Sequence, residues 1–256
     1  MQPMLAGLSG AFSGLSLGLI GGGGSVLAVP MLVYLVGVAN PHVAIGTSAL
    51  AVALSAFANL IPHARAGNVR WRTALIFAAA GMTGAWGGST LGKALDGGRL
   101  LFLFALVMMT VALLMLRPRR GGAKAPECLR PQCLARVGST AAAVGGLAGF
   151  FGIGGGFLVV PGLLFSTGMP MIEAVGTSLV AVGGFGIATA ANYAISGLVD
   201  WAVAAQFIAG GLVGGWGGVL IGRRLARSRG GLNIAYAVMV FSVGVYVLVQ
   251  NLHTLG

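Results

Sequence analysis

Long stretches without charge constrain this chain more than any other feature of its sequence. No Lys, Arg, Asp or Glu precedes Arg65, and 57% of the residues are hydrophobic whereas only 7% are charged. One apolar run within this first stretch covers residues 43–62, and further uncharged runs span 73–92, 100–116, 137–172, 174–199, 201–222 and 231–250. About 20 apolar residues in a helix cross a hydrocarbon layer of about 30 Å. The sequence therefore predicts an all-α, polytopic membrane protein.

Four short motifs recur in the same order about 130 residues apart. The pairs are IGTSAL (45–50) and VGTSLV (175–180), AN (58–59) and AN (191–192), GNVRW (67–71) and GLVDW (197–201), and GMTGAWGGSTLG (81–92) and GLVGGWGGVLIG (211–222). Chance similarity is common in apolar sequence, but four ordered matches at one offset indicate a duplication. We therefore predict a first transmembrane repeat over 1–116, a cytoplasmic basic linker over 117–136 and a second transmembrane repeat over 137–256.

Each repeat offers five hydrophobic segments. In the first repeat they cover residues 4–20, 25–38, 43–62, 73–92 and 100–116. The first two are short and flank a glycine run, so they are expected to form a hairpin that enters and leaves on one side. Whether this glycine-broken hairpin is re-entrant or fully spanning stays open. Three full crossings are expected to follow it in each repeat.

Charged residues in the loops predict how the two repeats are oriented. The cations cluster in short loops, so the net charge of +11 is better explained as a topology signal than as a nucleic-acid surface. The loops at Arg65–Arg72 and Arg117–Arg136 are basic and lie two crossings apart. In the second half the loop that corresponds to Arg65–Arg72 carries only Asp200, whereas the loop at 223–229 is basic. Equivalent loops are thus predicted on opposite sides, as in an inverted-repeat transporter, with both termini extracytoplasmic.

Two glycine runs interrupt hydrophobic segments, GGGGS at 21–25 and GIGGG at 152–156. Each glycine costs about 1 kcal/mol relative to alanine in a helix. Non-helical backbone is tolerated at membrane depth only where protein buries it or water reaches it. A helix end left bare there presents N–H groups and a partial positive charge, which favour an anion. The predicted substrate cradles comprise Gly22, Gly23, Gly24, Ser25, Gly154, Gly155 and Gly156; the alternative role of these glycines is close helix packing.

Hydroxyl and amide side chains extend this list of candidates. Thr47, Ser48, Thr177 and Ser178 place hydroxyl donors near the start of the third segment of each repeat. Their alternative role is helix capping or bonding to a carbonyl of the same helix. Asn59 and Asn192 are amides in otherwise apolar spans, where they either contact substrate or join neighbouring helices.

The glycine-rich turn followed by VLAVP or FLVVP, the GTS after it and the later glycine-rich stretch with its Trp resemble the sulfite exporter family, TauE/SafE. The resemblance covers nearly the whole chain and both halves. It implies multi-pass transport of small anions, chiefly sulfite, sulfonates and related organosulfur compounds, across a bacterial-type inner (plasma) membrane. Gly22 stands where the second copy has Ile153, and Ser25 stands where it has Gly156. The exact substrate is therefore not carried over.

The scarcity of acidic residues shapes the expected mechanism. Asp96, Glu127 and Asp200 are predicted in loops, and Glu173 at a membrane edge. No ionisable group is evident within the membrane, although Glu173 or His42 could relay protons from a rim. We therefore expect export of a small oxyanion assisted by the membrane potential, without metal, cofactor or covalent intermediate. An intramembrane enzyme is disfavoured because the chain has neither HExxH nor an intramembrane Asp.

The expected partners are the small anionic substrate and the lipid bilayer, with no nucleic acid. An uptake permease for sulfonates or small carboxylates and a non-transporting membrane scaffold remain alternatives. The sequence leaves the oligomeric state open, a homo-oligomer included.

Overall fold

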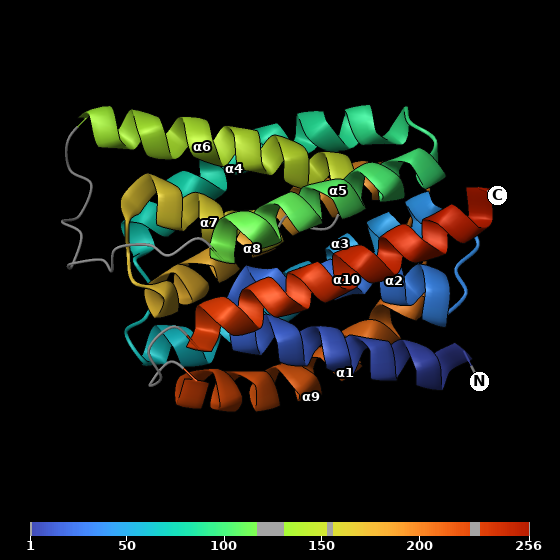
Figure 1. Cartoon of the computed structure of the whole chain (residues 1–256), viewed down its shortest axis with the longest axis horizontal. Helices are drawn as coiled ribbons and strands as arrows, with labels where there is room; N and C mark the ends of the chain where they lie inside the picture. The colour runs from blue at the N-terminus through green and yellow to red at the C-terminus, as the bar shows by residue number, and fades with distance from the viewer. Residues whose placement is uncertain (1, 117–130, 153–155, 226–230, 256) are drawn as a thin grey trace.

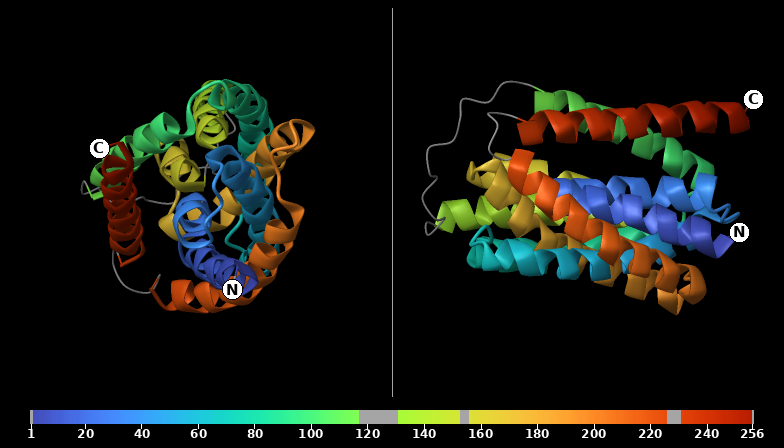
Figure 2. Two further views of the ribbon diagram at one scale, coloured as in Figure 1. Left: turned by 90° about the vertical axis from the view of Figure 1, so that its right-hand side faces the viewer. Right: turned by 90° about the horizontal axis from the view of Figure 1, so that it is seen from below.

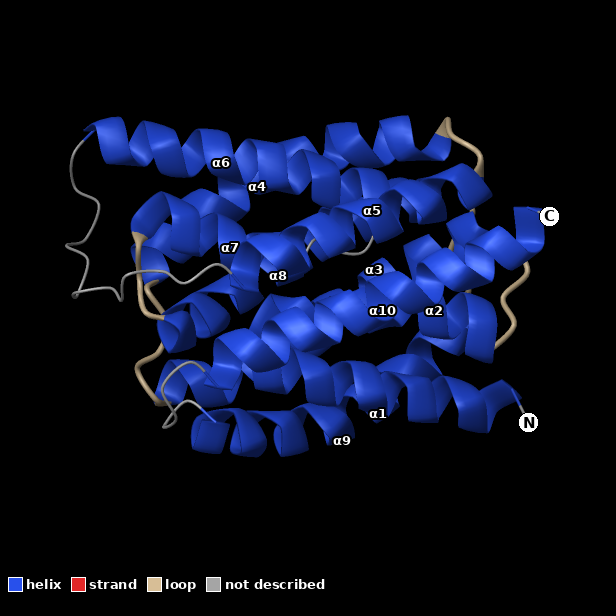
Figure 3. Cartoon of the chain, in the orientation of Figure 1, coloured by secondary structure: helices blue, strands red, loops and turns tan. Residues whose placement is uncertain are grey.

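The computed structural model describes residues 2–116, 131–152, 156–225 and 231–255, and within these ranges the chain is helical with no strand (Figure 3). The elements are α1 Gln2–Ile20, η1 Gly21–Leu27, α2 Ala28–Pro30, η2 Met31–Leu35, α3 Pro41–Arg65, α4 Trp71–Lys93, α5 Gly97–Leu116, α6 Pro131–Phe151, α7 Gly156–Thr167, α8 Met171–Ile195, α9 Trp201–Leu225 and α10 Gly231–Leu255. They lie roughly along one axis and form an elongated bundle (Figure 1).

The length and hydropathy of the helices confirm a multi-pass α-helical membrane protein. Five helices, α3, α5, α6, α8 and α9, each contain a described stretch long and apolar enough to cross a bilayer. The helices follow the predicted hydrophobic segments closely. The boundary between the linker and the second repeat differs from the prediction. Helix α6 already begins at Pro131, within the stretch 117–136 that was predicted to be the linker. Proline is favoured in the first turn of a helix, where its missing N–H is not needed.

The first glycine run ends α1 and turns the chain back. Gly21 has a φ of +68°, a left-handed conformation that glycine adopts without steric cost. The return segment runs through η1, α2 and η2, and the loop that joins η2 to α3 lies at the same end of the bundle as the N-terminus (Figure 1). The second half repeats this geometry, since Gly152 follows α6 with a φ of +67°.

Left-handed glycines mark equivalent helix ends in both halves. Besides Gly21 and Gly152, the pairs are Gly37 with Gly168 and Gly67 with Gly197, each again about 130 residues apart. All six follow the end of a helical segment, the position where a left-handed residue closes the last turn. The offset seen in the motifs is therefore also present in the backbone conformation.

Helices of one half pack against helices of the other in reciprocal pairs. The first helix of each half lies on the fourth helix of the other half, so α1 packs on α9 and α6 packs on α4. α3 and α8 pack on each other and contain more buried residues than the other described helices. α5 and α10 lie side by side along one edge of the bundle (Figure 2).

Glycine permits the closest of these helix contacts. On α1, a Cβ added to Gly14 or Gly18 would overlap backbone atoms of α9. On α6, a Cβ added to Gly145 or Gly149 would overlap backbone atoms of α4. Close backbone approach through small residues is a common basis of helix association in membranes, where burial of apolar side chains gives little driving force. The high glycine content thus has a direct packing role.

Candidate functional site

The two glycine-broken segments touch each other in the interior of the bundle. η1 and the first turn of α7 are in contact, and the closest approach joins Gly22 to Gly156. A Cβ added to either residue would overlap the carbonyl oxygen of the other. No larger residue fits at either position unless the backbone shifts.

Two buried serines supply the polar groups at this contact. The Gly22 N–H donates to Ser178 Oγ over 3.1 Å, and Ser178 Oγ in turn donates to the Val175 carbonyl over 2.8 Å. Ser25 Oγ donates to the Gly22 carbonyl over 2.9 Å. Both serine side chains are fully buried. The structure thus joins Gly22, Ser25, Gly156 and Ser178 into one cluster, to which η1, α7 and α8 all contribute.

The remaining glycine candidates differ in how far they can be placed. Gly23 and Gly24 belong to η1, next to this cluster in the chain. Gly154 and Gly155 lie outside the described residues.

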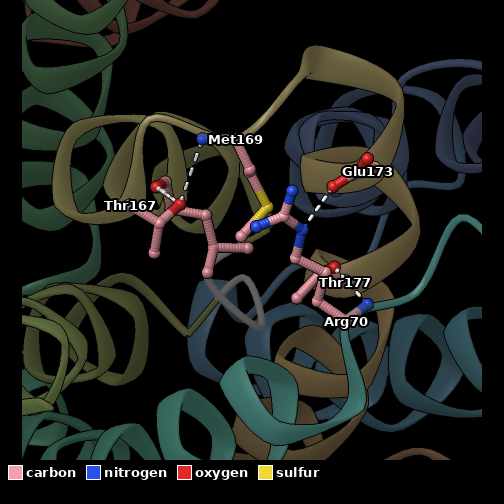
Figure 4. Close-up of polar contacts among 6 residues, drawn as sticks. Arg70, Thr167, Met169, Glu173 and Thr177 are labelled. Atoms are coloured by element: carbon pink, nitrogen blue, oxygen red, sulfur yellow. Dashed lines mark hydrogen bonds and ion pairs between the residues drawn. The ribbon is translucent and has the colours of Figure 1, made fainter. Parts of the chain in front are cut away.

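The GTS threonines each bond to the residue that precedes a helix of the other half. Thr47 Oγ1 accepts from the Asp200 N–H over 2.9 Å, just before α9 begins. Thr177 Oγ1 accepts from the Arg70 N–H over 3.1 Å, just before α4 begins (Figure 4). Each hydroxyl therefore fixes the start of a helix that belongs to the other half.

The two GTS motifs lie far apart. Gly46, next to Thr47, packs against Tyr193 near the end of α8. Thr177 lies sixteen residues before Tyr193 on the same helix, a rise of about 24 Å. Among the described residues, Ser48 Oγ bonds to the Ile45 carbonyl of its own helix, over 2.9 Å, as Ser178 Oγ bonds to that of Val175. Thr47 is thus not brought to the cluster that holds Ser178, whereas Ser48 lies one turn from Ile45, which packs against Gly152 at the second glycine run.

An ion pair lies where the chain enters α4. The Arg70 guanidinium pairs with the Glu173 carboxylate, and Figure 4 shows Glu173 and Thr177 one turn apart on α8, both facing Arg70. A positive charge at the start of a helix is unfavourable, whereas a carboxylate in a first turn is favourable. Glu173, in the first turn of α8, therefore balances Arg70. The sequence placed Glu173 at a membrane edge but gave no signal that identified Arg70 as its partner.

Asn192 joins α8 to α4. Its amide Nδ2 lies within hydrogen-bond distance of the Trp86 carbonyl, Ser89 Oγ and Thr90 Oγ1, at 3.1, 2.6 and 2.9 Å. Its Oδ1 accepts from Lys93 Nζ over 2.7 Å, and Lys93 also donates to the Asn192 carbonyl and to Ser196 Oγ. We call this group the α4–α8 polar cluster: Trp86, Ser89, Thr90, Lys93, Asn192 and Ser196. All three ammonium N–H groups are used, so Lys93 and Asn192 act here as a link between helices.

Asn59 has a different environment. Its side chain is buried against Gly215 of α9, and its Nδ2 has no hydrogen-bond partner among the described residues. Because α3 begins at Pro41 and α8 at Met171, Asn59 corresponds to Thr189, and Asn192 corresponds to Pro62. The two AN motifs are therefore offset by three residues. Thr189 Oγ1 is likewise buried without a partner in the described part of the chain.

Comparison with known proteins assigns the chain to a family. The family model for the sulfite exporter TauE/SafE matches residues 6–247. The chain belongs to the TauE/SafE family. A probable membrane transporter protein of Xylella fastidiosa (strain Temecula1 / ATCC 700964) is 52% identical over 244 residues, which cover 94% of this chain and 92% of the relative. YunE of Bacillus subtilis (strain 168), also named a probable membrane transporter protein, is 31% identical over 81% of this chain and 84% of its own length. No solved structure matches the chain.

Membership of the TauE/SafE family agrees with the resemblance found in the sequence and makes the chain a membrane transporter of this type. Three of the stretches that carried the resemblance meet at the cluster. They are the first glycine run in η1, Gly156 at the start of α7 and the second GTS motif in α8. The cluster at Gly22 is therefore built from the stretches by which a TauE/SafE sequence was recognised.

Proposed function

We propose that this TauE/SafE transporter exports a small oxyanion, sulfite or a related organosulfur anion, across a bacterial inner membrane. The observation that carries the proposal is the buried contact of the two broken segments, where Ser25 and Ser178 place hydroxyl groups beside Gly22. We assign Gly22, Gly23, Gly24, Ser25, Gly156 and Ser178 to the substrate site. Thr47, Thr177 and Asn192 are left out because their polar groups bond elsewhere, and Ser48 because its helix segment packs at Gly152 rather than at the Gly22–Gly156 contact.

The chemistry of this contact suits an oxyanion. α7 begins at Gly156, so its free N–H groups and the positive end of its dipole lie beside η1. Serine hydroxyls can donate to an anionic oxygen once they turn away from their present acceptors. The Gly22 and Gly156 backbones touch in this structure, so a ligand reaches these donors only when the two segments move apart.

Buried donors on the central helices support a polar route through the bundle. Asn59 Nδ2 on α3 and Thr189 Oγ1 on α8 occupy corresponding positions, and neither has a partner within the described ranges. A buried polar group without a partner costs about 1–3 kcal/mol, and most such groups in proteins bond to protein or ordered water. Water or a passing oxyanion would satisfy both groups.

The transport cycle we propose rests on two inverted repeats, each a glycine-broken hairpin followed by three transmembrane helices. Supporting this are the reciprocal pairs α1 with α9 and α6 with α4, and the hydrogen bonds of Thr47 and Thr177, which also correspond to each other. In inverted-repeat transporters one repeat moves against the other around a site at their junction. The Gly22–Gly156 contact lies at such a junction.

The placement of the acids favours export driven by voltage. Asp96 accepts from the Gly98 and Arg99 N–H groups at the start of α5, and Asp200 accepts from the first turn of α9. Glu173 is paired at the start of α8. The described acids thus act at helix ends rather than as proton carriers at mid-membrane. A negative interior favours expulsion of one negative charge by about 2.3 kcal/mol per 100 mV.

The test is flux of labelled sulfite in proteoliposomes under an imposed voltage or an imposed pH gradient. We expect flux that follows the voltage. Ser178→Ala should lower the flux at least about tenfold, because the hydroxyl at the site is lost and the buried Gly22 N–H loses its acceptor. Ser166→Ala is the matched control, since the bonds of this buried hydroxyl within the described residues go to carbonyls of its own helix α7.

Two results would contradict the proposal. One is sulfite flux that follows the pH gradient and ignores voltage. The other is equal flux in the Ser178→Ala and Ser166→Ala variants when both are folded. Thermal unfolding of each variant with and without sulfite separates lost binding from lost folding, because a bound anion raises the unfolding temperature only where a site exists.

A further inference from the structure

A groove opens between α3 and α9 near the ends of both helices. The cavity measures about 490 Å³, and its walls include Ile61, Pro62 and Arg65 on α3 and Trp216, Val219 and Leu220 on α9. The two helices run in the same direction, since Thr47 lies beside the start of α9 and Asn59 packs on Gly215 farther along. Trp216 is 71% exposed and Ile61 is 53% exposed, so the groove faces the membrane.

Each wall changes from apolar to cationic toward the same end of the bundle. Residues four apart on a helix lie on one face, so Arg65 follows Ile61 and Arg224 follows Leu220. Both arginines are exposed. Neither guanidinium has an ion pair within the described part of the chain. Arg65 therefore lines the polar end of the apolar groove, and helical spacing places Arg224 one turn beyond Leu220 at the same end.

The corresponding position in the other half is closed. There α8 and α4 are joined by the α4–α8 polar cluster. When α3 is aligned with α8 and α4 with α9 at their first residues, Asn192 corresponds to Pro62 and Ser89 to Val219. Thr90 corresponds to Leu220 and Ser196 to Ala66. Pro62, Val219, Leu220 and Ala66 have no polar side-chain group, so these four positions cannot form the bonds that close the gap between α4 and α8.

We propose that the α3–α9 groove binds an anionic phospholipid, with its phosphate between Arg65 and Arg224 and one acyl chain along Ile61, Trp216 and Leu220. A guanidinium forms paired hydrogen bonds to phosphate oxygens, which suits two arginines at a headgroup. Cations near the membrane surface favour anionic lipids over neutral ones. The site is independent of the oxyanion site proposed above and shares no residue with it.

Quenching of Trp216 fluorescence by brominated lipids tests the acyl-chain part. Trp71, Trp86 and Trp201 are exposed, so they can be replaced by Phe to leave Trp216 alone. In vesicles of mixed phosphatidylglycerol and phosphatidylcholine, we expect stronger quenching when the bromines are on phosphatidylglycerol. A variant that keeps only Trp86 is the matched control, because Trp86 occupies the corresponding position beside the closed gap. Equal quenching by the two lipids at Trp216 would overturn the proposal.

The headgroup part is tested on the unaltered tryptophan background. Native mass spectrometry of the purified protein should count retained phosphatidylglycerol, and Arg65→Gln with Arg224→Gln should weaken retention at least about tenfold. Arg99→Gln, at the start of α5, should have no effect. Inorganic phosphate should not displace the lipid. Retention unchanged in the double variant, or displacement by inorganic phosphate alone, would show that no lipid site of this kind exists.

Discussion

At the scale of single residues, one buried amide decides how two helices are joined. Asn192 uses both ends of its amide between α8 and α4, and Lys93 adds its charge at the last turn of α8. A cation near a helix C-terminus is stabilising because it faces the negative end of the dipole. The corresponding Pro62 cannot form such bonds, and the neighbouring gap stays open as a groove. Corresponding positions thus acquire different roles through single substitutions.

We predict that Asn192→Ala lowers the free energy of unfolding by about 2–3 kcal/mol, because Ser89 and Lys93 lose a buried partner. The double variant with Lys93→Ala should cost clearly less than the sum of the single variants, since both remove the same bond. Reversible unfolding in mixed micelles measures all three. Strict additivity would show that the lysine and the amide do not act together.

At the scale of elements, glycine has two separate roles in this fold. Gly21 and Gly152 end helices in a left-handed conformation. Gly149, by contrast, is helical and permits α6 to approach the backbone of α4 at Ala85. Gly138 lies on the same helix with no heavy atom within 4 Å of an added Cβ. The consequence of replacing a glycine therefore depends on the face of the helix that it occupies.

Gly149→Ala and Gly138→Ala form a matched pair that tests this distinction. Gly149→Ala should destabilise the protein by about 1–3 kcal/mol because the added methyl group overlaps α4 backbone. Gly138→Ala should be neutral or stabilise by up to about 1 kcal/mol, because alanine favours the helix. Unfolding curves of the two variants provide the measurement. Equal effects would mean that the α4–α6 contact is not as close as the structure places it.

At the scale of the whole molecule, both chain ends lie at one end of the bundle (Figure 1). This is the arrangement expected if each half forms a hairpin that returns to its starting side and three crossings. The basic residues Arg65, Arg70 and Arg72 flank the loop between α3 and α4, whereas Lys93 and Asp96 flank the loop between α4 and α5. Positive-inside logic assigns the first loop to the cytoplasm.

We therefore predict that epitope tags on the N-terminus and on the C-terminus are both accessible from outside in intact spheroplasts. A cysteine at exposed Arg72, in an otherwise cysteine-free chain, should react with an impermeant thiol reagent only after the membrane is opened. Labelling of the two tags from opposite sides of the membrane would contradict an even number of membrane crossings. Labelling of position 72 from outside would contradict the assigned orientation.

Much of the fold could be predicted because the apolar length of a segment and its glycine content determine where a helix forms and where it ends. The uncharged runs gave the helices within a few residues, and the interruption at Gly21 was visible as a run of poor helix formers. The candidate site was harder to predict. Thr47 was grouped with Thr177 and Ser178 because both triplets are GTS motifs, but about 24 Å of α8 separates Thr177 from Tyr193, against which Gly46 packs. A repeated motif indicates equivalent positions, and equivalent positions in oppositely directed helices lie at opposite ends.

The sequence by itself determined the class of the protein, its helices and its family, because these depend on the apolar length of each segment and on motifs read along the chain. Only the tertiary structure decided which polar groups meet. It joined Gly22 to Gly156 and Ser178, paired Arg70 with Glu173, used Asn192 as a link to α4 and left the groove beside Arg65 open. These contacts connect residues about 100 positions or more apart, or depend on the rotation of one helix against another, and no local pattern in the chain encodes either.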